Sequence, residues 1–316
     1  MFVKKNFPIR ASEIASYLKK KFYGKDFEIE TFSSINNIKD NSLVFFTKIV
    51  NSSFEIKEKK FFDENLLNNK KNILIIIDKD IEIKNLGITY INSNNPRFDF
   101  EDIIAKFFTY EEFESGISSS AIIESDTIID STAYIGPNCH IGSNVCIGKN
   151  TKIMANTVIN SNTIIGNNCR IKNNTSIAGE GFSFEKNEKR FIHFPHTGKV
   201  IIEDDVWIGS SVTIEKGTID NTIIKTGVKI DDLVHIGHNS FLGDNSQITV
   251  GAKILGRAIL GKNCWLSPGA VIDNGVKIGD NTLIGVNTHI RKNIENNCIV
   301  SGNPPRVIRK IKNDQL

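Results

Sequence analysis

The 316-residue chain is poor in the residues that would build a disulfide framework or a membrane span. It has five cysteines, an odd number, with no CxxC pair and no histidine at metal-ligand spacing, which argues against disulfides and against a metal site. Its longest purely apolar run is 73–77, far below the ~20 residues that cross a bilayer, and the first six residues lack the apolar stretch of a signal peptide. We therefore expect a cytoplasmic protein with no membrane span.

The chain also lacks an excess of either charge. It carries 39 Lys and Arg against 36 Asp and Glu, a formal net charge of +3, so the basic surplus that nucleic-acid binding requires is missing and we expect no nucleic-acid partner. With 40% hydrophobic and 24% charged residues the composition is that of a globular protein, which excludes disorder throughout the chain. The length is typical of about two domains.

Isoleucine is abundant and recurs at a fixed interval of six residues. The run is unbroken from Ile123 to Ile177, resumes for three repeats from Ile202, and continues with Ile or Leu from Ile224 to Ile290, giving 25 hexapeptides. Glycine often follows the isoleucine and asparagine comes shortly afterwards, and both tolerate the left-handed backbone of tight turns. A six-residue period fits a short strand followed by a corner, so three strands close a coil of about 18 residues, and roughly eight coils stack as a parallel β-helix.

The remaining sequence defines the flanking segments. Residues 1–113 carry helix and strand patterns, with a helix over 11–20 that Ser12 caps, a buried strand over 72–78 and a helix over 98–113, and we predict a small α/β domain there. The solenoid domain spans 114–302. An excursion loop over 179–200 interrupts it with two histidines and four phenylalanines, and a coil needs no such loop for stability. Residues 303–316 form a short, basic C-terminal tail.

Several motifs together resemble one family. The α/β domain, the GEGFSF segment from Gly179, the run KVIIEDDVWIGSSVTI from Lys199 and the run KIDDLVHIGHN from Lys229 resemble the UDP-3-O-(3-hydroxyacyl)glucosamine N-acyltransferases among the hexapeptide-repeat acyltransferases. This resemblance implies a left-handed parallel β-helix and a homotrimer with active sites between subunits. It also implies acyl transfer from a 3-hydroxyacyl carrier protein to the amine of a UDP-amino sugar, in lipid A type biosynthesis.

Acyl transfer to an amine needs a base and a donor for the oxyanion, and histidine titrates near working pH. His238 lies two residues after an inward Ile236 and so projects outward from its coil. The resemblance implies that His238 is the general base, with Asp231 as its partner. It implies an oxyanion or donor-groove role for the amide of Gly237, and we expect the same role for the amide of Gly256 from its place about one coil later.

Other polar residues are candidates for substrate binding. These are His235 and Asn239 beside the base, and His193 and His196 in the excursion loop, where each histidine either contacts the sugar nucleotide or stabilises the loop. The family's N-terminal domain binds uridine, which implies that Phe45 and Phe46 stack on uracil; packing in a core strand is the alternative. No tightly bound cofactor and no metal are expected.

The acyl donor is left open between two thioesters, the phosphopantetheine of acyl carrier protein and coenzyme A. The runs CWLSPGAVI from Cys264 and SGNPPRVIR from Ser301 are similar to sugar acetyltransferases that use acetyl-coenzyme A, so an alternative is a UDP-amino-sugar acetyltransferase for a surface polysaccharide. A basic tail suits either donor. An alternative of another class is a non-catalytic β-helix that serves as a binding scaffold.

Overall fold

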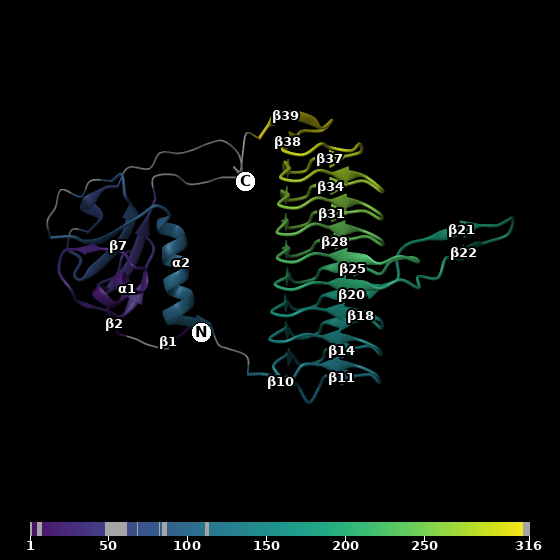
Figure 1. Cartoon of the computed structure of the whole chain (residues 1–316), viewed down its shortest axis with the longest axis horizontal. Helices are drawn as coiled ribbons and strands as arrows, with labels where there is room; N and C mark the ends of the chain where they lie inside the picture. The colour runs from purple at the N-terminus through teal and green to yellow at the C-terminus, as the bar shows by residue number, and fades with distance from the viewer. Residues whose placement is uncertain are drawn as a thin grey trace. The chain divides into compact units, whose positions relative to one another are not determined.

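The structure divides into two compact units. The computed structural model describes residues 2–4, 8–47, 62–67, 69–81, 83, 87–110 and 114–311 (Figure 1). Contacts within the chain separate residues 1–112 from residues 113–316. The first unit mixes helices and strands, whereas the second is almost entirely short strands.

The first unit is built on a five-stranded sheet. In spatial order its strands are β3 (Phe22–Tyr23), β8 (Thr89–Ser93), β7 (Ile73–Asp78), β6 (Ser42–Phe46) and β5 (Thr31–Phe32). All neighbours are parallel except β3 and β8. Successive side chains of β7 point to opposite faces, so Leu74 and Ile76 pack with the helices while Ile73, Ile75 and Ile77 form a second core.

The helices of this unit are shorter than the sequence patterns predict. They are α1 (Ala11–Tyr17), α2 (Pro96–Phe107) and the 3-10 helix η1 (Glu64–Leu67). Two small antiparallel pairs flank them, β1 (Phe2–Lys4) with β9 (Phe108–Tyr110) and β2 (Ile9–Arg10) with β4 (Glu28–Ile29). The prediction that helix α2 continues to 113 is wrong because the chain turns into β9, and 111–113 lie outside the described residues.

The predicted cap of α1 is also wrong. The residue at the N-cap is Arg10, which makes no side-chain cap bond. Ser12 lies inside the first turn, and its amide donates a hydrogen bond to the Asp26 carboxylate at 3.0 Å. A carboxylate distant in sequence therefore satisfies one of the free amides at this helix end.

The second unit is a solenoid with three parallel sheets. The first sheet contains β10 (Gly116–Ile117), β13 (Tyr134–Ile135), β16 (Lys152–Ile153), β19 (Arg170–Ile171), β24 (Trp207–Ile208), β27 (Lys229–Ile230), β30 (Gln247–Ile248), β33 (Trp265–Leu266), β36 (Leu283–Ile284), β38 (Cys298–Ser301) and β39 (Arg306–Lys310). The second sheet contains β11 (Ile122–Ile123), β14 (His140–Ile141), β17 (Val158–Ile159), β20 (Ser176–Gly179), β25 (Thr213–Glu215), β28 (His235–Ile236), β31 (Lys253–Ile254), β34 (Val271–Ile272) and β37 (His289–Ile290). The third sheet contains β12 (Ile128–Ile129), β15 (Cys146–Ile147), β18 (Thr163–Ile165), β23 (Val200–Ile202), β26 (Thr222–Ile224), β29 (Phe241–Leu242), β32 (Ile259–Leu260) and β35 (Lys277–Ile278).

The six-residue period describes the interior of this solenoid. Each repeating isoleucine pairs with the isoleucine one coil away, as Ile135 does with Ile153, and these side chains fill one continuous core. Among the described residues the three sheets contain 11, 9 and 8 strands, so the solenoid is longer than the roughly eight coils expected. The predicted left-handed parallel β-helix is confirmed.

The corners explain the asparagines and glycines. Asparagines three positions after the inward residue adopt left-handed backbone, with φ of 55° at Asn144, 59° at Asn239 and 56° at Asn245. Glycines directly after the inward residue serve a different purpose. A Cβ on Gly209 would lie 2.4 Å from a backbone carbon of Asp231, so this glycine lets two coils approach closely.

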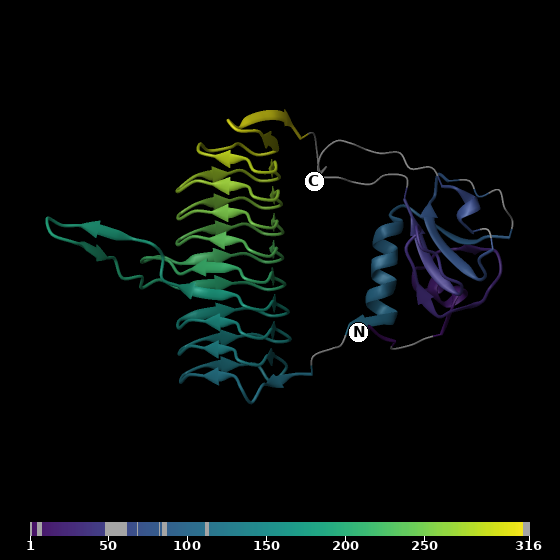
Figure 2. The same ribbon diagram turned by 180° about the vertical axis from the view of Figure 1, so that it is seen from behind.

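Two segments depart from the regular coils. Within the excursion loop, β21 (Phe184–Lys186) and β22 (Phe191–His193) pair as an antiparallel hairpin that projects from the solenoid, as Figures 1 and 2 show. In the predicted tail, residues 306–310 form β39, which pairs antiparallel with β38 and so borders the first sheet. The end of the tail, 312–316, lies outside the described residues.

Candidate active site

His238 lies where each coil passes from the second sheet to the third, at a position hereafter called the His238 corner. The tripeptide Gly237-His238-Asn239 directly follows β28, and the imidazole is half-buried. The ring nitrogen Nδ1 lies 2.9 Å from Oδ1 of Asn239. Whether Nδ1 donates or accepts this hydrogen bond depends on whether the oxygen or the nitrogen of the Asn239 amide faces the ring.

The contacts of Asn239 fix the orientation of its amide group. Oδ1 accepts a hydrogen bond from the backbone N–H of Thr218 at 3.0 Å, and Nδ2 donates to the carbonyl of Asp220 at 3.0 Å. A backbone N–H only donates and a carbonyl only accepts, so the amide cannot be flipped. Nδ1 of His238 must then carry the proton and donate to Oδ1, which leaves Nε2 of the neutral ring with a free lone pair.

Glu215 holds the backbone of His238. It ends β25, one coil before His238, and its Oε2 accepts a hydrogen bond from the His238 amide at 3.0 Å. Glu124 holds the amide of Ser143 in the same way, at 2.9 Å, at another turn of the solenoid. Acidic residues one coil below thus replace the missing backbone partner of a corner amide.

The excursion loop returns to this corner through His196 and Gly181. His196 is only 3% exposed, and its Nδ1 donates to the carbonyl of Phe194 at 2.9 Å, so Nε2 is the unprotonated nitrogen of the neutral ring. The rings of His196 and His238 meet edge to face at 5.5 Å. A Cβ on Gly181 would lie 2.8 Å from Nε2 of His196 and 2.9 Å from Oε2 of Glu215, so only glycine fits between them.

Burial also sets the charge of His196. Loss of hydration lowers the pKa of His196 below its ordinary value, and the neighbouring rings of His238 and His193 act in the same direction, whereas the carbonyl of Phe194 opposes the shift. The neutral form of His196 is therefore favoured beside His238.

His193 lies one step further out. Its ring stacks on that of His196 at 5.5 Å with an interplanar angle of 17°. Its Nδ1 is 3.6 Å from Glu180, whose carboxylate is also 3.5 Å from Nζ of Lys216. The Glu180 carboxylate thereby links His193 of the excursion loop to Lys216, which follows β25.

Gly256 occupies the His238 corner one coil later. A Cβ at this position would lie 2.6 Å from Nε2 of His238, so the imidazole lies directly over the glycine. The residue that would cap the Gly256 amide from the coil below is Gly237, which has no side chain. Within the described part of the chain, no acceptor receives a hydrogen bond from the Gly256 N–H.

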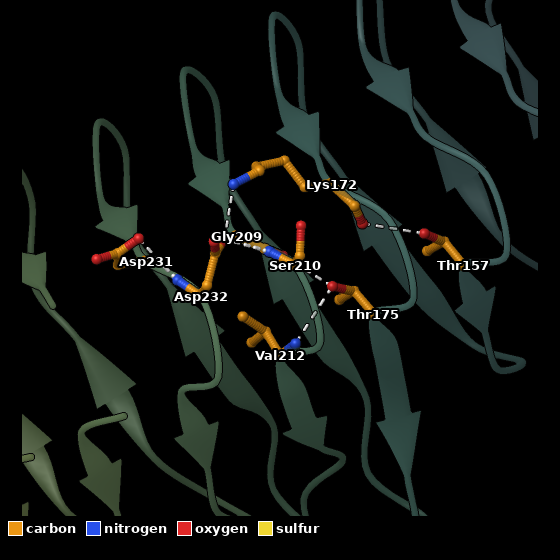
Figure 3. Close-up of polar contacts among 8 residues, drawn as sticks. All are labelled: Thr157, Lys172, Thr175, Gly209, Ser210, Val212, Asp231 and Asp232. Atoms are coloured by element: carbon orange, nitrogen blue, oxygen red, sulfur yellow. Dashed lines mark hydrogen bonds and ion pairs between the residues drawn. The ribbon is translucent and has the colours of Figure 1, made fainter. Parts of the chain in front are cut away.

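Gly237 and Asp231 are placed differently from the expectation. The amide of Gly237 donates to the carbonyl of Ile254 at 2.7 Å, so its N–H is engaged and does not serve an oxyanion. Asp231 lies at the preceding corner of the same coil, at the opposite end of β28, where its Oδ1 accepts from the amide of Asp232 (Figure 3). Within the described chain, the ring partner of His238 is Asn239.

The corner with Asp231 has its own polar network. Oδ1 of Asp232 accepts hydrogen bonds from Nζ of Lys172 and from the amide of Ser210, both at 2.7 Å, as Figure 3 shows. These bonds lower the pKa of the Asp232 carboxyl, with Lys172 as the main cause. The network ties three successive coils together.

Three further predicted residues have contacts of their own. His235 lies on the outer face of β28, where its Nδ1 is 2.8 Å from Oγ1 of Thr213. Phe46 is 6% exposed in the second core of the first unit, and the ring of Phe45 packs 4.8 Å from Phe100. Both rings therefore take part in packing there.

The residues that sequence reasoning missed are Glu215, Glu180, Gly181 and Thr218. A signal for them exists in the spacing of the repeats. The step from Ile177 to Ile202 and the step from Ile214 to Ile224 are both longer than six residues, and both cross from the second sheet to the third. The two breaks in the period therefore lie on the His238 corner.

The described residues contain neither a candidate metal centre nor a membrane-spanning helix. They contain no group of three or more His, Cys, Asp or Glu side chains arranged to hold a metal ion. Among the helices of the described ranges, none combines the length and apolar character needed to cross a bilayer.

Family models match most of the solenoid. The bacterial transferase hexapeptide model of six repeats matches residues 120–151, 147–179 and 257–292, and the hexapeptide repeat of succinyl-transferase matches 199–232 and 233–274. Over these ranges the second unit is similar to the hexapeptide repeats of transferases. These matches bear out the periodicity found in the sequence.

Curated relatives match a shorter segment, in the C-terminal part of the chain. UDP-3-O-acylglucosamine N-acyltransferase from Methylobacillus flagellatus is 50% identical over 70 residues, which is 22% of this chain and 20% of that protein. The protein of the same name from Coxiella burnetii is 48% identical over 71 residues, 22% of this chain and 21% of that protein. The aligned segment thus spans about a fifth of these relatives, and over it the resemblance expected from the motifs is confirmed.

Solved structures share the fold at lower identity. UDP-N-acetylglucosamine O-acyltransferase from Moraxella catarrhalis superimposes with a TM-score of 0.54 at 24% identity, covering 62% of this chain and 75% of that one. LpxA from Acinetobacter baumannii gives a TM-score of 0.55 at 24% identity, covering 61% and 74%. This likeness concerns the β-helix alone.

Proposed function

We propose that the protein transfers an acyl group from a thioester to the amine of a UDP-linked amino sugar, with His238 as the general base. The observation that carries this proposal is the free Nε2 of His238, which Asn239 sets in the neutral tautomer and which lies directly over Gly256. A base and an uncapped N–H at one corner are the two groups that aminolysis of a thioester requires.

The reaction follows from these groups. The amine nitrogen attacks the thioester carbonyl, Nε2 of His238 takes the proton that the nitrogen loses, and the Gly256 N–H donates to the developing oxyanion. The C–N bond forms, the C–S bond breaks, and the proton on His238 passes to the leaving thiolate. Asn239 stabilises the imidazolium because its Oδ1 accepts the hydrogen bond from Nδ1 of His238 throughout the reaction.

The names of the curated relatives support the choice of substrates. Proteins named UDP-3-O-acylglucosamine N-acyltransferase match the chain over the C-terminal segment, so the acceptor is a UDP-3-O-acyl amino sugar of the kind used for lipid A. The donor is a 3-hydroxyacyl chain on acyl carrier protein phosphopantetheine. Phe45 and Phe46 remain the candidates for uracil stacking in the first unit. His193 and His196 are the substrate contacts nearest to the base, and His235 is the one that lies along β28.

A homotrimer is the assembly we propose. The outward positions of the third sheet form an unbroken apolar stripe across seven coils, comprising Ile128, Cys146, Ile164, Ile201, Ile223, Phe241 and Ile259. Ile128 is 68% exposed in the single chain, and a soluble protein rarely leaves such a row uncovered. The stripe adjoins the His238 corner, so association along it brings a neighbouring subunit to the site.

The test uses the purified protein with UDP-3-O-acylglucosamine and one of two donors, 3-hydroxyacyl carrier protein or acetyl-coenzyme A, and measures the thiol released. We expect thiol release and an amide product with the carrier-protein donor, and three times the chain mass by light scattering. Turnover with acetyl-coenzyme A alone would favour the surface-polysaccharide acetyltransferase. If neither donor were consumed, both acyltransferase functions would be contradicted and a non-catalytic binding scaffold would be favoured.

A further inference from the structure

A line of aromatic rings leads from His238 to the end of the β21–β22 hairpin that lies nearer the solenoid. Starting at His238, the ring centroids of His196, His193, Phe184 and Phe182 follow one another at 5.5, 5.5, 5.0 and 5.0 Å. The first two rings carry the polar chemistry of the corner. The last two are purely apolar and belong to the hairpin that projects in Figures 1 and 2.

The apolar rings gather on one face of the hairpin. Phe184 pairs with His193 and Lys186 pairs with Phe191 across the two strands, so these four side chains share a face, whereas Glu185 and Ile192 lie on the other. Phe182 is 87% exposed, Phe184 44% and Phe191 67%. We name Phe182, Phe184 and Phe191 the aromatic ridge.

The ridge lies on the acceptor side of the base. The uncapped Gly256 amide, where the donor carbonyl is expected, belongs to the coil after His238. The hairpin leaves from β20 and returns to β23, on the opposite side of the His238 coil. A group that extends from the attacking amine toward the hairpin therefore belongs to the acceptor sugar and not to the acyl donor.

We propose that the aromatic ridge binds the alkyl chain of an O-acyl group carried by the acceptor sugar. This proposal rests on the function proposed above, in which the acceptor is an acylated amino sugar. The rings of Phe182 and Phe184 are exposed and apolar, and Phe191 adds a third ring with Nζ of Lys186 5.8 Å from its centroid. A surface of this kind matches a long methylene chain, because the burial of apolar surface favours its binding. The ridge selects acceptors by the length of this chain.

The test compares acceptors with a 3-O-myristoyl and a 3-O-acetyl group. In the double variant Phe182→Ser, Phe184→Ser we expect kcat/KM for the myristoyl acceptor to fall on the order of 10- to 100-fold, with little change for the acetyl acceptor. The matched control is Ile192→Ser, which removes an exposed apolar side chain from the other face of the same hairpin, and it should leave both rates unchanged.

Three other outcomes would each contradict the proposal that the aromatic ridge binds the acyl chain of the acceptor. Equal losses with both acceptors would mean that the rings only order the loop. A changed preference for donor chain length would assign the surface to the donor, and a change in molar mass by light scattering would assign it to a second copy of the chain.

Equilibrium binding of both nucleotide sugars, measured without donor, separates this proposal from the reaction itself. One outcome is that the unmodified protein binds the myristoyl form more tightly than the acetyl form, that the double variant loses this difference, and that no acyl transfer is seen. This outcome would contradict the proposed reaction only. Equal binding of both forms by the unmodified protein would contradict the ridge only.

Discussion

Oδ1 of Asn239 accepts a hydrogen bond from Nδ1 of His238 at 2.9 Å and from the Thr218 amide at 3.0 Å. An asparagine next in sequence to the base thus performs the orienting task that was expected of Asp231. The carboxamide is neutral, so it fixes the tautomer without adding charge to a half-buried corner. In the neutral imidazole, Nε2 is therefore the nitrogen without a proton.

Replacing Asn239 with glycine should lower kcat while leaving KM nearly unchanged. Glycine keeps the left-handed backbone of this position, φ 59°, but removes the acceptor of the Nδ1 proton. We expect a loss of about 10- to 100-fold in kcat, as for other residues that orient a functional histidine. Asn245→Gly removes a corner asparagine six residues later and should have no such effect in steady-state kinetics. Equal rates for the two variants would contradict the orienting role.

Replacing His238 with alanine should reduce turnover by about 10²- to 10⁴-fold, the usual contribution of a general base. His140→Ala is the matched control because His140 also lies on the second sheet, where its Nε2 is 2.9 Å from Oε1 of Glu124. Thiol release and light scattering should be measured together. An active His238→Ala protein would remove the proposed mechanism.

Gly256→Ala should inactivate the protein without unfolding it. The new Cβ would lie 2.6 Å from Nε2 of His238, so the ring must move, and displacement of a catalytic group by about 1 Å can cost on the order of 10²-fold in rate. Gly179→Ala is the control, since the nearest atom to its Cβ would be Oγ of Ser176 at 4.0 Å. Thermal melting should be similar for both variants, whereas retained activity in Gly256→Ala would argue against this placement of the base.

His196→Gln should reduce the loss of stability on acidification. The folded-state pKa of His196 is lowered, so as the pH falls below the unfolded value of about 6.5 the unfolded chain takes up a proton that the folded chain refuses. The free energy of unfolding therefore decreases as the pH falls below this value. Glutamine does not titrate, so denaturant unfolding between mildly alkaline and mildly acidic pH should show a flatter profile for the variant. Parallel profiles would contradict the burial of a neutral ring.

The interior cysteines should resist alkylation in the native protein. Burial raises the pKa of Cys169 to about 11 and that of Cys264 to about 11, and both are nearly inaccessible. The thiolate is the reactive species, so iodoacetamide near pH 8 should modify them only after denaturation. Mass spectrometry of native and denatured samples tests this, and rapid labelling of Cys169 in the native state would contradict it.

The hexapeptide pattern was enough to predict the β-helix, because one residue in six is forced inward by the geometry of a three-sided coil. The partner of the base was harder to predict. Asp231 is seven residues before His238 in sequence, but a whole strand lies between them and puts them at neighbouring corners. Glu215 is 23 residues away and lies directly below the base, and only the four-residue insertion after Ile214 hints at that contact.

Local patterns in the first unit were less reliable for a similar reason. Ser12 has the chemistry of a helix cap, yet Asp26 bonds to the first-turn amide from outside the helix. The aromatic pattern of β6 indicated either stacking or packing, and the contacts of Phe45 and Phe46 within the unit depend on α2 and on residues far along the chain. Contacts with residues distant in sequence cannot be predicted from a short stretch of sequence.

The ladder of the third sheet continues in register across the long excursion, whereas β20, where the excursion begins, pairs irregularly with β25. Thr163 on β18 pairs with Val200 on β23 as if the intervening hairpin were absent, and Val200 pairs in turn with Thr222. A corner of this scaffold can therefore accept many added residues at the expense of only one bend. New binding specificity can evolve by lengthening a corner beside an existing base, since such an insertion leaves the folding of the neighbouring coils unaltered.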